Sequence, residues 1–106
     1  MLLIDLWAKK INPSSPYADI TQVVFLGKNP PALMTQIYDI VWKAQQTAIK
    51  YLEKKLMDKQ EVTGCELDDV CRSVIQQAGY GNYFVHRTGH NIHTDLHGLG
   101  PNIDNF

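Results

Sequence analysis

All four histidines of this 106-residue chain fall within a single segment of twelve residues. Glycines lie within this segment and directly after it, which argues against a regular helix and favours a loop or an extended chain. Neutral imidazole is the commonest metal ligand, and its pKa also suits proton transfer near neutral pH. The cluster therefore predicts a metal or acid–base site, built from His86, His90, His93 and His97.

The spacing of the histidines limits how many of them can share one centre. In an extended segment His86 and His90 point to one side, whereas His93 and His97 point to the other. Without a bend in the chain, two or three imidazoles at most can meet. A single histidine is more often an ordinary polar residue than a ligand, and this alternative stays open for each of the four.

Acidic partners for such a site are expected on an N-terminal β-hairpin. The apolar residues of 2–8 predict a strand buried on both faces, and the β-branched and aromatic residues of 17–26 predict a second strand. If the intervening turn is centred near Asn12, Asp5 faces Asp19 and Trp7 faces Tyr17. Two opposed carboxylates need a cation or a shared proton. The alternative is that either aspartate ends its strand or points to solvent.

The middle of the chain predicts two amphipathic helices. Apolar residues recur at three- and four-residue steps over 32–56. Thr63 and Glu66 have the spacing of a capping box, so a second helix starts there and ends at Gly79. Cys65 and Cys71 fall on different sides of this helix, so we expect both to be reduced, with Cys71 in the core. A short strand is expected at 83–86.

Size and charge restrict the classes of function. A chain of 106 residues with 44% hydrophobic residues predicts one small globular domain. The net charge of -1 gives no reason to expect nucleic acid or an anionic membrane as a partner. The apolar run at the N-terminus is too short for a signal peptide or a membrane span, so the cytoplasm is the expected location. Mixed carboxylate and imidazole ligands suit manganese, iron, cobalt or zinc better than calcium.

Four stretches of the chain resemble the catalytic domain of the pita-bread metallopeptidases: LLIDLWAKK, YADIT, AGYGNYFVHRTGH and LHGLGPNIDN. These enzymes are the methionine aminopeptidases, the Xaa-Pro aminopeptidases and the Xaa-Pro dipeptidases (prolidases), and HRTGH is most similar to the proline-specific branch. The resemblance implies an α+β fold for residues 1–106. We expect a partial pita-bread fold, with an antiparallel β-hairpin, further strands and two packed helices.

The resemblance also implies roles for individual residues. The family holds two divalent metal ions, such as manganese, cobalt or zinc, with two aspartates, one histidine and two glutamates. By motif position Asp5 and Asp19 match the aspartates and His90 matches the histidine ligand. His97 matches a histidine that contacts the substrate near the scissile bond, and His86 matches a further active-site histidine of the proline-specific members. His93 stands where the family usually has glycine and is assigned no role, and Asn91 also replaces a glycine.

The two family glutamates lie beyond the histidine segment, and this chain ends at Phe106 before either of them. The resemblance also implies that the N-terminal half of the family domain lies outside these 106 residues. We therefore expect a fragment of a dinuclear-metal-dependent Xaa-Pro peptidase that acts on peptides with proline in second position and is inactive as an isolated chain. A non-catalytic binding or assembly module is the alternative, and ends without biological meaning are a third. An uncovered sheet edge predicts homo-oligomers or complementation by the missing segment.

Overall fold

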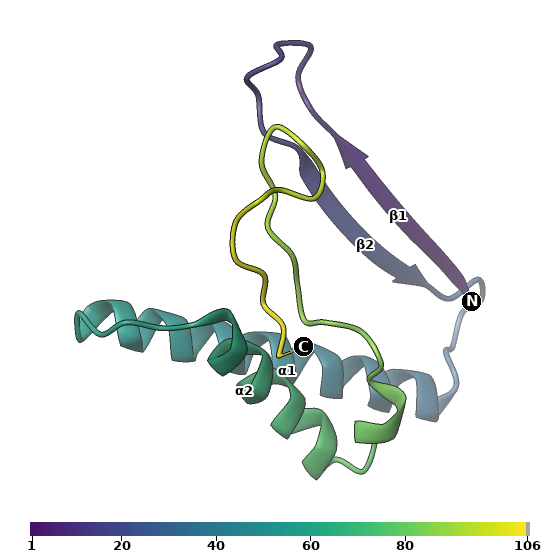
Figure 1. The fold of residues 1–106 in the computed structure, drawn as a ribbon. Coiled ribbons are helices and arrows are strands. Elements are labelled where there is room, and N and C mark those ends of the chain that lie inside the picture. Colours follow the sequence, from purple (N-terminus) through teal and green to yellow (C-terminus); the bar gives the residue numbers. More distant parts are fainter. Residues whose placement is uncertain (106) are drawn as a thin grey trace.

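A computed structural model describes residues 1–105 of the chain (Figure 1). Strands β1 (Leu2–Ala8) and β2 (Ala18–Val24) form an antiparallel hairpin, and helices α1 (Ala32–Met57) and α2 (Gly64–Gln77) form a packed pair. A short 3₁₀ helix, η1 (Gly81–Tyr83), follows α2. The residues after η1 run back from the helices to the hairpin and then return to the helices (Figure 1). The histidine segment therefore connects two parts that are otherwise separate.

Small side chains allow the two helices to pack closely. Ala44 and Ala48 lie one turn apart on α1, and they form the core with Cys71 and Ile75 of α2. Residues of the segment around η1, including Phe84, pack against this core. Cys71 is buried and Cys65 exposed, and both are free thiols, as the sequence predicted. The core thus lies between the helices rather than under the sheet.

The start and end of α2 agree with the sequence prediction. Thr63 and Glu66 form the full capping box, in which each side chain bonds the backbone N–H of the other residue. Gly79 follows the helix with a φ of 84°, a left-handed conformation that favours glycine. None of the helices within residues 1–105 is long and apolar enough to cross a membrane.

The register of the hairpin differs from the prediction by two residues. Asp5 faces Thr21 and Trp7 faces Asp19, so the two aspartates are diagonal neighbours rather than opposed residues. The turn explains the difference, because Asn12 begins it: its backbone carbonyl accepts from Ser15 and its side chain accepts from Ser14. A shift of two residues keeps every side chain on its predicted face.

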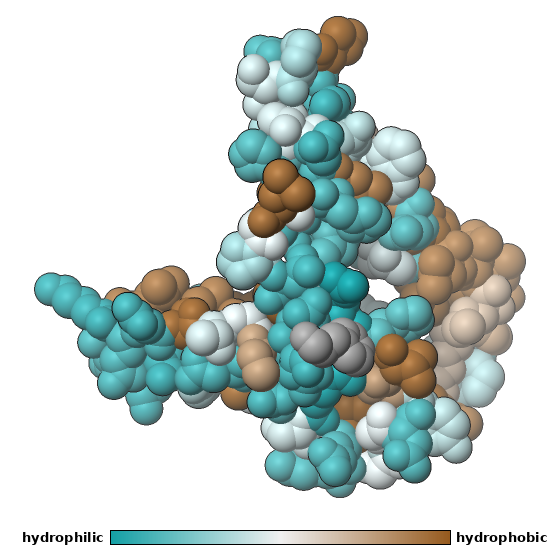
Figure 2. All heavy atoms as spheres, viewed as in Figure 1, coloured by the Kyte–Doolittle hydropathy of each residue, from teal (hydrophilic) through white to brown (hydrophobic). Residues whose placement is uncertain are grey.

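Two other predictions about strands are wrong. Residues 83–86 form no strand; the backbone there bonds to a helix side chain instead, and the extended pairing begins only with the bridge between Gly89 and Ile103. Strand β1 is not buried on both faces, since Leu3 is 59% exposed and Trp7 56% exposed. The reason is that neither helix packs against the sheet. Hydrophobic side chains accordingly gather over the hairpin near the N-terminus (Figure 2).

Candidate metal centre and active site

The histidine segment is held against the end of the hairpin by two hydrogen bonds to its backbone carbonyls. The Tyr17 N–H donates to the carbonyl of His93 at 2.9 Å, and Lys9 Nζ donates to the carbonyl of Thr94 at 3.0 Å. The contacts of Tyr17 and Lys9 join residues 76 and 85 positions apart in sequence, and they place the segment beside β2 (Figure 1). The two ends of the segment are joined to each other, because Gly89 and Ile103 exchange two hydrogen bonds of 3.1 Å.

Asp19 and His90 come together at this place. The Nε2 atom of His90 lies 3.3 Å from Oδ2 of Asp19, and both side chains are about three-quarters or more buried. The Nδ1 atom of His90 lies 3.1 Å from its neighbour's carbonyl, that of Asn91. A proton on Nδ1 would satisfy that carbonyl and leave the Nε2 lone pair facing the carboxylate. This is the usual arrangement of a metal-binding histidine.

His97 also lies at this site. Its ring stands edge-on to the ring of His90, with 4.6 Å between the centroids. The loop between the two histidines turns around Asn91, whose backbone carbonyl accepts from Gly98 at 2.9 Å. The amide of Asn91 fills the space that a Cβ at Gly98 or Gly100 would need. Asn91 thus shapes the loop that carries His97.

Asp5, the third predicted ligand, makes a different contact. Its Oδ1 accepts a 2.6 Å hydrogen bond from the Thr21 hydroxyl across the hairpin, and its side chain is exposed. Within residues 1–105 no three histidine, cysteine, aspartate or glutamate side chains lie close enough to hold a metal ion together. The carboxylate and imidazole of Asp19 and His90 nevertheless fit a divalent transition metal by donor type, since both are among its preferred ligands.

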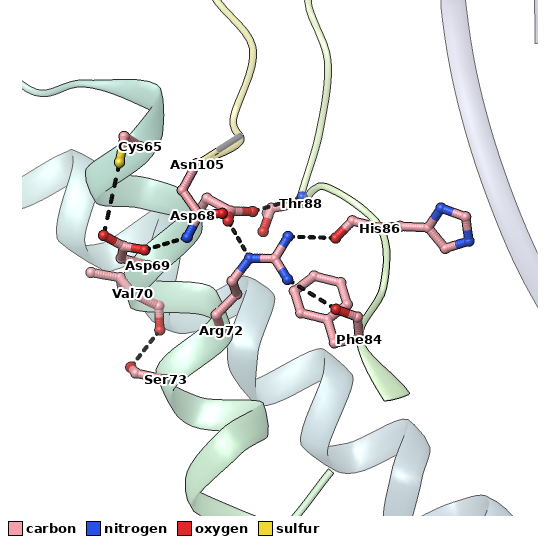
Figure 3. Close-up of polar contacts among 10 residues, drawn as sticks. All are labelled: Cys65, Asp68, Asp69, Val70, Arg72, Ser73, Phe84, His86, Thr88 and Asn105. Carbon is pink, nitrogen blue, oxygen red and sulfur yellow. Dashed lines mark hydrogen bonds and ion pairs between the residues drawn. The ribbon is translucent and has the colours of Figure 1, made fainter. Parts of the chain in front are cut away.

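The remaining two histidines lie apart from this pair. His86 contributes its backbone carbonyl to a hydrogen bond with Arg72, while its exposed imidazole extends away from that contact (Figure 3). His93 is exposed and its Nδ1 lies 3.1 Å from the hydroxyl of Thr94. The structure thus groups Asp19, His90 and His97, and it leaves Asp5, His86 and His93 outside the group.

A groove extends from Asp19 and His90 along the face of α1 that looks toward β2. Its volume is about 1110 Å³, and Asp19, Thr88 and His90 are among the residues that line it. Helix α1 contributes a mostly apolar wall, with Met34, Ile37, Tyr38, Val41 and Trp42. The lining could accept a ligand that has a polar group and a largely apolar surface.

Sequence reasoning missed a buried ion pair behind the histidine segment. Asp68 is fully buried on α2 and pairs with Arg72 one turn later. Burial raises the pKa of Asp68, but hydrogen bonds from Thr88 and Arg72 outweigh it, so the pKa lies below its ordinary value. The signal was present in the sequence. Asp68 shares the helix face of Cys71 and Ile75, and a carboxylate on an apolar face calls for a partner.

Comparison with known proteins identifies the family. Residues 1–106 match the model of metallopeptidase family M24. The chain is 34% identical over 97 residues to the Xaa-Pro dipeptidase of Pyrococcus furiosus, covering 92% of this chain and 25% of that protein. It is 40% identical over 88 residues to the Xaa-Pro dipeptidase of Lactobacillus delbrueckii subsp. lactis, covering 83% and 22%. The chain therefore spans about a quarter of the length of these curated relatives.

Solved structures show the same likeness. A dipeptidase from Pyrococcus horikoshii OT3 superposes with a TM-score of 0.80 at 32% identity, covering 96% of this chain and 26% of that chain. The prolidase from Pyrococcus furiosus gives a TM-score of 0.75 at 31% identity, covering 98% and 28%. The α+β arrangement of hairpin and paired helices is therefore part of the pita-bread fold, as the sequence predicted.

Proposed function

Because this chain belongs to metallopeptidase family M24, we propose that it supplies part of the metal-binding and substrate-binding residues of an Xaa-Pro peptidase. The reaction is hydrolysis of the bond between an N-terminal residue and proline. The named relatives that support the substrate class are Xaa-Pro dipeptidases. Because the chain spans about a quarter of their length, we propose this activity for a whole peptidase and not for these 106 residues alone.

One observation carries the proposal: the 3.3 Å contact between Asp19 and His90, made by residues 71 positions apart. These two side chains, with Asp5 of the same sheet face, are the residues proposed to hold the metal. When bound, a divalent metal supplies Lewis-acid chemistry and lowers the pKa of water. Asn91 accepts from Nδ1 of His90 in this proposal, which fixes the tautomer so that Nε2 stays free as a ligand.

His97 and His86 are proposed to act on the substrate. The His97 ring lies 4.6 Å from that of His90, centroid to centroid, so an N–H of His97 can donate to a peptide carbonyl held near the same point. His86 is exposed and belongs to the same segment, where it can contact the substrate from the side. The apolar wall of the groove suits an uncharged side chain and a proline ring.

Manganese, cobalt or zinc is the proposed metal, and two ions are the proposed number. The two free cysteines are compatible with the cytoplasm, the location we propose. We also propose that the 106 residues by themselves have negligible turnover. Asp5, Asp19 and His90 supply three proposed ligands for two ions, whereas a catalytic site needs about three protein ligands for each metal.

Calorimetric titration with manganese, cobalt and zinc tests the proposal directly. The wild-type chain should bind at least one of these metals, and both Asp19→Ala and His90→Ala should abolish binding. His93→Ala is the matched control, because the His93 side chain is exposed and its one hydrogen bond within residues 1–105 is to the neighbouring Thr94 hydroxyl, while its backbone bonds are kept in the variant. Absence of binding by the wild type, or binding that survives His90→Ala, would refute the proposal. Rapid cleavage of an Xaa-Pro dipeptide by the chain alone would refute its predicted inactivity.

A non-catalytic assembly module is the second candidate, and the exposed hairpin is the observation that favours it. Leu3, Leu6 and Trp7 are each more than half exposed, and both edges of the two-stranded sheet are unpaired within residues 1–105. Such edges add strands from other chains readily. Sedimentation of the 106-residue chain, with and without Leu6→Lys, would detect self-association through this surface. A monomer at all concentrations would exclude homo-oligomers.

A further inference from the structure

The backbone that leads into the metal-binding histidine has almost no regular hydrogen bonding of its own. Residues 84–88 lie between η1 and the Gly89–Ile103 bridge and belong to neither helix nor strand. Backbone groups in such a stretch require partners from elsewhere when they are shielded from water. Two side chains of α2, Asp68 and Arg72, make three hydrogen bonds with the backbone of this stretch (Figure 3).

Arg72 binds two carbonyls of this stretch at once. Its Nη1 donates to the carbonyl of Phe84 at 2.9 Å, and its Nη2 donates to the carbonyl of His86 at 2.6 Å. The guanidinium also lies over the Phe84 ring, 4.5 Å from its centroid. The planar fork is specific to arginine: a lysine ammonium could lie over the ring, as Lys9 does over Tyr17, but it has no fork with which to bind both carbonyls in this geometry.

Asp68 completes the arrangement from the other side. One carboxylate oxygen accepts from Nε of Arg72 and fixes the guanidinium, and the other accepts from the Thr88 N–H at 2.9 Å. Asp68 is fully buried, so these bonds are not exchanged for water. Thr88 is two residues before His90. The pair therefore holds the chain at three points, the last of them next to the proposed ligand.

We propose that Asp68 and Arg72 are positioning residues for the metal centre. By fixing the backbone at Phe84, His86 and Thr88, they set the direction in which the segment enters the Gly89–Ile103 bridge, and so keep Nε2 of His90 facing Asp19. This inference rests on the proposed function for its role in metal binding, although the positioning itself does not depend on a metal. A pair that only stabilised α2 would leave the geometry at His90 unchanged.

Arg72→Lys is the discriminating variant, because it keeps the charge beside Asp68 and removes the fork. Arg87→Lys is the matched control: Arg87 is in the same segment, but it is exposed and makes a surface ion pair with Asp104 at 3.2 Å. Thr63→Ala is the stability control. It weakens the capping box of α2 without touching residues 84–90.

The first readout is structural and needs no metal. Nuclear Overhauser effects between the rings of His90 and His97 report their 4.6 Å approach, and amide exchange at Gly89 reports the bridge to Ile103. Arg72→Lys should abolish the ring contact and lower Gly89 protection at least about tenfold, a local opening as in sub-global exchange. Both controls should retain the ring contact.

The second readout is manganese affinity by calorimetry, which should fall about 10–100-fold in Arg72→Lys, as for loss of outer-shell support, and less than threefold in Arg87→Lys. An unchanged ring contact and Gly89 exchange in Arg72→Lys would overturn the inference, as would a loss of protection spread evenly over the chain as in Thr63→Ala. If the wild type binds no metal, the proposed function fails while the first readout still decides the positioning. Should Arg72→Lys not fold, Asp68→Asn is measured against the same criteria.

Discussion

Gly64→Ala should destabilise the chain although it introduces a better helix former. Gly64 is the first residue of α2, and the return of the chain after the histidine segment passes directly over it. A Cβ at position 64 would overlap the backbone carbonyl of Asn102. That carbonyl belongs to a segment which is held at Asn102 itself and at the next residue, Ile103. The Asn102 side chain accepts from Asn91, and Ile103 pairs with Gly89.

Two effects of opposite sign decide the outcome. Replacing glycine by alanine in a helix gains at most about 1 kcal/mol, and less at the first position. Forcing an extra carbon into an occupied site costs about 1–3 kcal/mol when the neighbour cannot rotate away. Here the neighbour is backbone rather than a flexible side chain, so the steric effect should dominate. We expect a net loss of about 1–2 kcal/mol in the free energy of unfolding.

Urea unfolding followed by circular dichroism measures this loss, with Gly89→Ala as the control. A Cβ at Gly89 would lie 3.6 Å from the Ile103 side chain, an ordinary contact, so that variant should change stability by less than about 0.5 kcal/mol. Because the clash displaces Asn102, Gly64→Ala should also perturb the amide resonances of Asn91 and Gly89. A Gly64→Ala variant more stable than the wild type would show that the segment does not cross α2 as described.

Two further predictions concern the helix pair. Ile75→Ala removes three carbons from a side chain that is only 6% exposed, so it should lower the free energy of unfolding by about 2–5 kcal/mol in the same urea assay. Ile49→Ala is the control, because Ile49 is 48% exposed and its loss should cost less than half as much. Stability should also depend on the charge of Asp68, whose pKa lies below its ordinary value of 3.8 because its hydrogen bonds outweigh the opposing effect of burial. The stabilisation by the ionised Asp68 is present above about pH 4 and is lost as the pH falls through the lowered pKa. The free energy of unfolding of the wild type should therefore fall more steeply with acid than that of Asp68→Asn. Equal dependence on pH in the two proteins would contradict this.

Local features of the sequence were sufficient for the helices. The capping box of Thr63 and Glu66, the stop at Gly79 and the apolar periodicity each act within about one or two helical turns. The prediction of 32–56 for the first helix therefore agrees with Ala32–Met57 to one residue. The family motifs were equally readable, because motif order along the chain is a property of the sequence.

Contacts between distant segments were less predictable. The hairpin register depends on where Asn12 starts the turn, and a two-residue error preserved the faces but exchanged the partner of Asp5 for Thr21. Residues 83–86 have the composition of a strand, yet Arg72 takes up their carbonyls and no strand forms. The register was therefore decided by details of the turn itself, whereas the missing strand was decided by Arg72, a residue of another element.

Local sequence signals predicted the two helices, the hairpin and the family motif that contains His90. The folded chain was needed to show that His90 meets Asp19 while Asp5 and His86 lie apart, and that Asp68 and Arg72 bind the backbone of residues 84–88. The difference lies in how far apart in sequence the interacting residues are. Helix periodicity and capping depend on interactions between residues within a few positions of each other. The geometry of the site depends on segments about 70 residues apart, and the entropy cost of closing that loop has to be offset by packing.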